Sequence, residues 1–267
     1  MRRGYLCDNF VSVPIQLTHF EQNNPFVGDY EATLAELQRR ISRLQLAQVV
    51  HRRRTIILVE GWEEAGRSAL LRRLSAALDP CHVATHCVRP RDEDEERHWL
   101  APFWACLPTA GKTVMFNGSW YRLIANRRVS DQIDDRGFSR ACDEINEFES
   151  QQHDHGTLIV KLFLHIRQET QAERLREQGG DPWRRWLIDP AEVRAAEHRA
   201  EQQRAWEAMF AQTDTRWSPW KVINASDRRG GRIAALEAIA GALEKAMPVD
   251  PPGDHEKIVL FPQQRSA

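Results

Sequence analysis

A glycine-rich segment between an apolar run and an amphipathic run constrains the fold of this chain more than any other feature. The apolar run covers residues 55–59, the segment reads Gly-Trp-Glu-Glu-Ala-Gly-Arg-Ser over residues 61–68, and the amphipathic run covers residues 68–78. This order of a strand, a GxxxxG turn with a basic residue and a serine, and a helix is typical of a phosphate-binding loop. Backbone N–H groups of such a turn point at one anion, and the positive end of the helix dipole strengthens binding.

One position of this loop departs from the usual pattern. Arg67 stands where a lysine is expected. Lysine is a compact point charge that reaches the transferred phosphate, whereas arginine is a longer planar fork. The residues expected to bind phosphate are Gly61, Ala65, Gly66, Arg67 and Ser68. The exchange at Arg67 leaves catalysis open.

Short apolar runs alternate with helical patterns along the rest of the chain. Further strands are expected at residues 82–88, 113–116, 157–166 and 220–223, and helices at 30–48, 68–78, 98–107, 143–152, 169–213 with an interruption at 179–182, and 232–246. This alternation predicts an α/β fold with a parallel sheet of about five strands and helices on both faces. Ligands of such sheets bind at the carboxyl ends of the strands, where residues 61–68 and 117–121 both fall.

The 267 residues suit one large domain with appendages. We expect an irregular, loosely attached N-terminal arm over residues 1–28, a main domain over 29–247 and a flexible tail over 248–267. Residues 91–97 form a dense charge run, which we interpret as a solvated helix start.

Composition argues against several classes of function. The formal net charge of −1 argues against a nucleic-acid-binding protein, and no apolar run approaches the roughly 18 residues that a membrane-spanning helix needs. The five cysteines form no CxxC pair, and the N-terminus lacks the apolar region of a signal peptide. We expect a cytoplasmic protein that binds neither nucleic acid nor a membrane. Cys106 lies in an apolar run without an evident base partner, so the sequence predicts no nucleophilic role for it.

Phosphoryl transfer needs more than an anion-binding loop. It also needs an acid that holds magnesium and mobile cations that cover the phosphates. The third strand ends at Asn117, a neutral and poor magnesium ligand, where an aspartate would serve. Glu63 and Ser68 are therefore the candidate Mg²⁺ ligands, although Glu63 equally fits a solvent-facing loop carboxylate. The candidate arginines for covering the phosphates, each of which also fits an ordinary surface charge, are Arg174, Arg184 and Arg185.

Further landmarks match a known family. From about residue 29 to 246 the chain resembles the type-2 polyphosphate kinases. The landmarks are residues 61–68, Leu78-Asp79-Pro80, Leu107-Pro108, Ser119-Trp120-Tyr121, Phe148-Glu149, Asp181-Pro182 with Trp186, Thr213-Asp214-Thr215, and Pro219-Trp220. The resemblance implies a P-loop kinase-like three-layer fold with a helical lid at about residues 167–213. It also implies phosphoryl transfer between inorganic polyphosphate and AMP, ADP, GMP or GDP, with Mg²⁺ as cofactor, and a homo-oligomer.

The chain departs from the family pattern at the positions that handle charge. Active members carry lysine at the position of Arg67 and an Asp-Arg pair at Asn117-Gly118, so Asn117 is a degenerate catalytic position. The other family positions for an arginine or lysine that differ here are Pro102, Leu123 and Leu187. The chain is most similar to the first of the two fused domains of polyphosphate:AMP phosphotransferases, a domain that lacks the catalytic residues.

Two functions fit these observations. In the first, the chain is an enzyme with an altered site, in which Arg67 holds phosphate, Glu63 and Ser68 organise Mg²⁺, and Arg174 or Arg184 covers polyphosphate. In the second, it is a catalytically silent domain that binds polyphosphate or nucleotide, or that pairs with itself or with an active family member. Magnesium-dependent turnover distinguishes the two.

Overall fold

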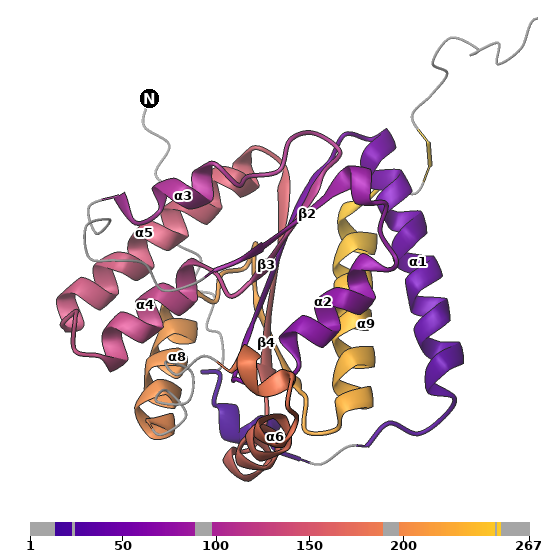
Figure 1. Cartoon of the computed structure of the whole chain (residues 1–267). Coiled ribbons are helices and arrows are strands. Elements are labelled where there is room, and N and C mark those ends of the chain that lie inside the picture. Colours follow the sequence, from indigo (N-terminus) through magenta and orange to yellow (C-terminus); the bar gives the residue numbers. More distant parts are fainter. Residues whose placement is uncertain (1–13, 23–24, 89–97, 189–197, 249, 252–267) are drawn as a thin grey trace, which may run out of the picture.

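A five-stranded parallel sheet forms the centre of the molecule (Figure 1). The computed structural model describes residues 14–22, 25–88, 98–188, 198–248 and 250–251. The strands are β1 (Arg54–Gly61), β2 (Val83–Cys87), β3 (Thr113–Asn117), β4 (Thr157–His165) and β5 (Trp220–Asn224). Their order across the sheet is β2-β3-β1-β4-β5. The expected α/β class with a parallel sheet of about five strands is confirmed.

Helices cover both faces of the sheet (Figure 1). On one face lie α1 (Tyr30–Val50), α2 (Arg67–Ser75) and α9 (Arg228–Ala246). On the other lie α3 (Ala101–Trp104), α4 (Trp120–Val129), α5 (Asp135–Asp154) and α8 (Arg199–Thr213). The remaining elements are α6 (Gln168–Gly180) and the 3₁₀ turns η1 (Leu17–Phe20), η2 (Pro80–His82) and η4 (Arg184–Leu187). None of the described helices is both long and apolar enough to cross a membrane.

The central strands explain why the apolar runs are continuous. β1 is buried from Thr55 to Gly61, and β4 is buried along almost its whole length, because helices exclude water from both of their faces. The parallel register places Gly61 beside Leu164 and Asn117 beside Val59. The loops that follow β1 and β3 therefore lie next to each other at the carboxyl ends of the strands.

The structure corrects the bounds of three expected helices. The segment at 98–107 forms only the short helix α3, which has Pro102 in its first turn and ends four residues before Pro108, and Trp104 is 44% exposed instead of buried. Helix α5 begins ahead of the expected 143–152 because Asp134 caps it, accepting a hydrogen bond from the backbone N–H of Gly137 (2.7 Å). Helix α9 likewise begins before residue 232, because Asp227 accepts from the N–H of Gly230 (2.7 Å).

Helix α4 was not expected from the sequence. It begins after Ser119, whose hydroxyl oxygen accepts from the backbone N–H of Tyr121 (3.3 Å). Its buried side chains are Trp120, Tyr121, Ile124 and Ala125. The N-cap serine was the available signal, but the aromatic pair that follows it has low helix propensity and masks the pattern.

The described part of the N-terminal arm is packed and not loosely attached. Leu17 is fully buried, and its backbone N–H donates to Glu207 of α8 (3.0 Å). The charge run at 91–97 and tail residues 252–267 lie outside the described residues. The segment expected to form a lid comprises α6, η4 and α8, and α8 packs against α4 and α5 with Trp206 and Phe210 buried. The lid bounds remain a prediction.

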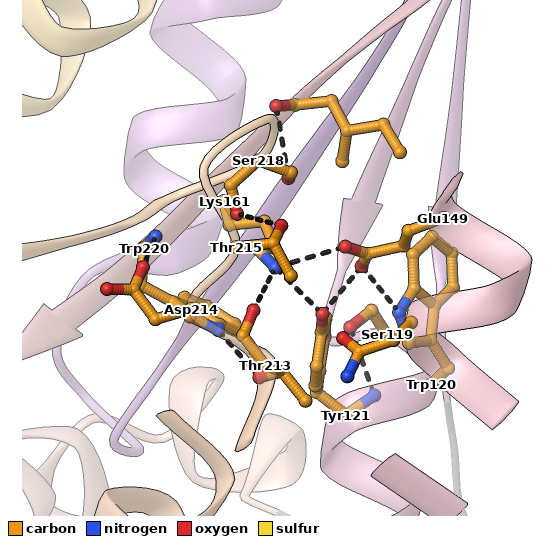
Figure 2. A network of polar contacts seen from close by, with 12 residues as sticks. Ser119, Trp120, Tyr121, Glu149, Lys161, Thr213, Asp214, Thr215, Ser218 and Trp220 are labelled. Carbon is orange, nitrogen blue, oxygen red and sulfur yellow. Dashed lines mark hydrogen bonds and ion pairs between the residues drawn. The ribbon is translucent and has the colours of Figure 1, made fainter. Parts of the chain in front are cut away.

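A buried ion pair joins the sheet to the helices on one face (Figure 2). Lys161, in β4, is fully buried, and its Nζ lies 3.0 Å from Oε2 of Glu149 in α5. The same ammonium donates to the hydroxyl oxygen of Tyr121 (3.0 Å) and to the carbonyl oxygen of Thr213 (2.7 Å). Glu149 also accepts from the hydroxyl of Tyr121 (2.6 Å) and from Nε1 of Trp120 (3.1 Å). All three ammonium protons therefore have acceptors.

These residues are also landmarks of the sequence. Trp120-Tyr121, Glu149 and Thr213 were recognised there as parts of a family pattern, and here they form one buried network. Burial lowers the pKa of Lys161 while the charge of Glu149 opposes that shift. Burial, followed by the charge of Glu149, raises the pKa of Tyr121 well above its usual value. The landmarks on this face therefore stabilise the fold.

Breaking this pair from one side is expected to destabilise the protein strongly. Glu149→Gln or Lys161→Met leaves a buried charge without its partner, which commonly costs about 3–5 kcal/mol of the free energy of unfolding. Urea denaturation measures the loss. The control is Glu201→Gln in the exposed Arg204–Glu201 pair, where we expect at most about 0.5 kcal/mol. Losses of similar size at both pairs would show that Lys161 and Glu149 are not held as described.

Candidate functional site

The segment at residues 61–68, which we call the glycine loop, connects β1 to α2. Gly61 has a φ of +139°, and a Cβ at this position would lie 2.4 Å from the carbonyl oxygen of Leu164, so only glycine fits. Gly66 has a φ of +99° and stands at the N-cap of α2. The two glycines allow the chain to turn sharply from the buried strand into the helix.

Arg67 turns back onto an acid of its own loop. Its Nη2 lies 2.5 Å from Oε1 of Glu63, and the arginine side chain is almost completely buried. The same Glu63 oxygen accepts from Nη1 of Arg122 in α4 (2.8 Å). Arg122 also donates to the carbonyl oxygen of Gly61 (3.0 Å). The charge that was expected to bind phosphate is therefore offset by a carboxylate within the loop.

Arg122 and Glu60 were missed by the sequence interpretation. An arginine was expected near the Trp-Tyr pair but was sought at Leu123, one position beyond Arg122. Glu60 is fully buried at the end of β1, where it accepts from the hydroxyl of Ser119 (2.7 Å) and lies 3.5 Å from Nε of Arg122. An acid directly before Gly61 was the available signal for this second carboxylate.

The arrangement does not fit a magnesium site at Glu63 and Ser68. Mg²⁺ prefers charged oxygen ligands, but Oε1 of Glu63 already accepts from two guanidinium groups. Asn117 supplies only a neutral amide, and its Nδ2 donates to Oγ of Ser68 (3.2 Å). Within the described residues, no group of three or more histidine, cysteine or acidic side chains is placed to hold a metal ion. Glu63 and Ser68 therefore do not form a Mg²⁺ site in this arrangement.

A cavity of about 280 Å³ lies beside the glycine loop. Its charged lining residues are Glu64, Arg174, Arg184, Arg228 and Arg232. Arg228 is also paired with Glu177 of α6 (2.6 Å), so the cavity has four guanidinium groups against two nearby carboxylates. This excess of positive charge makes the cavity suitable for a polyanion. Arg228 and Arg232, which lie in the first turns of α9, were not singled out in the sequence. Arg185, a third candidate from the sequence, is exposed and is not part of this lining.

The two sequence-predicted arginines of this cavity differ in their freedom to move. Arg174 is buried and donates to the carbonyl oxygens of Glu64 (3.0 Å), Ala225 (2.9 Å) and Ser226 (2.7 Å). It therefore braces the glycine loop against the turn after β5, and burial lowers its pKa. Arg184 is about half exposed and lies 3.9 Å from the carboxylate of Glu64, so it is the arginine that can turn towards a ligand.

The back of the glycine loop is held through Trp62. Its Nε1 donates to Nδ1 of His165 (2.8 Å), and the guanidinium of Arg199 in α8 lies 3.5 Å from the centre of the indole ring. Because Trp62 is a donor only, Nδ1 of His165 is the acceptor and the neutral ring carries its proton on Nε2. That nitrogen lies 3.4 Å from Oε1 of Glu21 in the N-terminal arm. Three distant segments thus meet behind the loop.

The comparisons with known proteins agree with this architecture. A family model described as polyphosphate kinase 2 matches residues 27–251. The chain belongs to the polyphosphate kinase 2 family. The resemblance seen in the sequence is therefore confirmed at the level of the family.

Individual members of the polyphosphate kinase 2 family support the assignment. A polyphosphate:AMP phosphotransferase of Pseudomonas syringae pv. tomato is 32% identical over 223 residues, which are 83% of this chain and 45% of that protein. A crystal structure from Pseudomonas aeruginosa PA01, assigned to polyphosphate kinase 2, is 29% identical with a TM-score of 0.78, over 84% of this chain and 49% of that one. The chain spans about half the length of the polyphosphate:AMP phosphotransferases that it matches.

The fold is also shared with a shorter polyphosphate kinase 2. The crystal structure from Arthrobacter aurescens TC1 superposes with a TM-score of 0.80 at 23% identity, and the match covers 94% of this chain and 96% of that one. The fold of this chain therefore matches both a protein of about twice the matched length and one of about equal length.

We expect His165 to make the stability of the protein depend on pH. Burial and, secondarily, the charge of Arg199 lower its pKa from 6.5 to about 4. Between these values the unfolded chain binds more protons, so the free energy of unfolding falls by about 2–3 kcal/mol as the pH decreases from 6.5 to 4. Urea denaturation at pH 4, 5, 6 and 7 measures this loss. In His165→Gln, which retains an acceptor for Trp62, this part of the loss is expected to disappear; parallel pH profiles would refute the assignment.

Proposed function

We propose that this member of the polyphosphate kinase 2 family binds inorganic polyphosphate in the arginine-lined cavity without transferring phosphoryl groups from it. The observation that carries the proposal is the position of Arg67. Its guanidinium is paired with Glu63, while four other arginines line the cavity next to the loop. The cavity arginines thus supply positive charge for binding polyphosphate, whereas Glu63 offsets the positive charge of Arg67 in the glycine loop.

The ligand class follows from what the relatives have in common. Their names include polyphosphate:AMP phosphotransferase, ADP-polyphosphate phosphotransferase and GDP-polyphosphate phosphotransferase. The nucleotide differs among these proteins, whereas polyphosphate is common to all of them. A chain of phosphates also suits a cavity in which guanidinium groups form most of the charged lining, because one guanidinium can bind two phosphate oxygens at once.

Electrostatic reasons argue against efficient catalysis. Removing one charged group from a preorganised site commonly slows a reaction about 10²–10³-fold. Here the loop arginine is paired, the strand-end position carries Asn117, and Glu63 is surrounded by two guanidinium groups. These three changes lie within one site, so their effects on the rate are not additive.

A second candidate, an active phosphotransferase, rests on Ser68. This residue is exposed at the start of α2, where its hydroxyl can reach a ligand at the helix N-terminus. In this case a ligand would separate Arg67 from Glu63 and free both for binding. A variant of either candidate is that this chain pairs with itself or with an active family member.

Polyphosphate binding is expected to depend on the cavity arginines. Isothermal titration calorimetry with tripolyphosphate measures the affinity, and loss of one charge-assisted hydrogen bond in Arg228→Gln or Arg232→Gln is expected to weaken it about tenfold. The matched control is Arg140→Gln on the exposed surface of α5, where the affinity is expected to stay unchanged. Equal affinities in all three variants, or no binding by the unmodified protein, would refute the proposal.

The same protein is then assayed for turnover. Polyphosphate and Mg²⁺ are supplied with AMP, ADP, GMP or GDP, and we expect no phosphorylation above that seen without protein. Phosphorylation that disappears in Arg67→Ala would instead establish the active phosphotransferase. Binding and turnover are measured separately, so the outcome for one does not decide the other.

A further inference from the structure

A thiol and an imidazole meet at the outer edge of the sheet. Sγ of Cys106, which follows α3, lies 3.7 Å from Nδ1 of His86 in β2. The sequence interpretation found no base partner for Cys106, and the structure corrects it, because the partner comes from an edge strand 20 residues away. We infer that Cys106 is a reactive thiol that forms a mixed disulfide with small anionic disulfides.

The imidazole is held in place by packing. The ring of His86 stacks on Phe116 of β3, with ring centres 5.4 Å apart and planes inclined by 30°. Both Cys106 and His86 are partly buried, so water competes weakly for the thiol proton. A ring fixed by stacking keeps Nδ1 directed at Sγ, which is the arrangement that activates a thiol nucleophile.

An open cavity gives a reagent access to the pair. It has a volume of about 320 Å³, and its lining includes Cys106, His86, Lys112, Val83, Leu107 and Pro108. This volume lies at the small end of the range for ligand pockets and suits a small organic molecule. Among the described residues of the lining, Lys112 is the only ionisable nitrogen side chain besides the imidazole, and none is acidic. The ammonium of Lys112 donates to the carbonyl oxygen of Cys81 at the rim of the cavity. An anionic reagent is therefore favoured.

The reaction is a thiol–disulfide exchange. His86 accepts the proton of Cys106, and the resulting thiolate attacks one sulfur of the small disulfide. The sulfur–sulfur bond of the reagent breaks as a new bond forms to Sγ of Cys106. The departing thiolate takes the proton back from the imidazolium, so Cys106 is oxidised to the disulfide level and half of the reagent is reduced to a thiol.

The other described cysteines lack this combination. Burial raises the pKa of Cys142 to about 12, so its thiolate is not available. Cys87 is exposed, and its neighbour is the amide nitrogen of Asn117 at 4.0 Å, which is a donor and takes no proton. Cys81 is exposed as well and lines the same cavity as Cys106, so the comparison of these two thiols tests the effect of the imidazole and not of access. Exposure alone therefore predicts that Cys81 and Cys87 react faster than Cys106, whereas the pairing with His86 predicts the opposite order.

The order of reactivity tests the inference. The folded protein is incubated with oxidised glutathione, and mass spectrometry of digests gives the rate of adduct formation at each cysteine. We expect Cys106 to react about tenfold faster than Cys81 and Cys87, because the imidazole beside it accepts the thiol proton as the new sulfur–sulfur bond forms. In His86→Phe, which retains the ring stack on Phe116, Cys106 is expected to become the slowest of the three. The rates of Cys81 and Cys87 in the same molecule report whether the variant is folded.

A second variant covers the case in which His86→Phe disturbs the fold. His86→Gln is expected to slow Cys106 in the same way. The inference is overturned if Cys106 reacts more slowly than both exposed cysteines in the unmodified protein, or if its rate is unchanged in a folded His86 variant.

Lys112→Met tests the preference for anionic reagents. This variant is expected to react more slowly with oxidised glutathione but not with neutral bis(2-hydroxyethyl) disulfide. Equal effects on the two reagents would overturn the preference for anions.

Discussion

The buried ion pair of Lys161 and Glu149 is the interaction on which the rest of the structure depends. It joins the sheet to α4, α5 and the end of α8, because its hydrogen bonds reach Tyr121 and Thr213 as well. A buried charge without a partner is costly, so these elements must keep their relative positions. Arg122 directly follows Tyr121 and reaches Glu63 in the glycine loop. The network that stabilises the fold therefore also positions a cation of the candidate site.

Charge is distributed unequally on the two sides of the glycine loop. Towards α4, the guanidinium groups of Arg67 and Arg122 are engaged by Glu63. Towards α6 and α9, an arginine-lined cavity stays open, and Arg174 fixes its backbone frame. Behind the loop, Trp62 connects it to β4 and α8. In the proposed function, an anion therefore binds beside the loop, where the arginines are, and not at the loop itself, where Glu63 offsets the charge of Arg67.

Local patterns predicted much of the fold. The strands β1 and β4 are long apolar runs because helices cover both faces of the sheet. Such a run can be recognised in the sequence without knowing which residues it contacts. Helix α4 escaped prediction because its start combines a serine cap with Trp120 and Tyr121, which are buried by tertiary packing and not by helical periodicity. The shortness of α3 depends on prolines, and the early start of α9 depends on an aspartate cap. The strength of such local signals relative to the apolar pattern is hard to judge from the sequence.

The sequence by itself determined the glycine loop, because Gly61 and Gly66 permit backbone angles that other residues avoid. It also determined the family and the departure at Arg67. Only the tertiary structure decided what these charges do: Arg122 is 59 residues from Glu63, and Cys106 is 20 residues from His86. Such pairs arise from strand register and helix orientation, which bring distant side chains within bonding distance. Spacing along the chain carries no information about contacts of this kind.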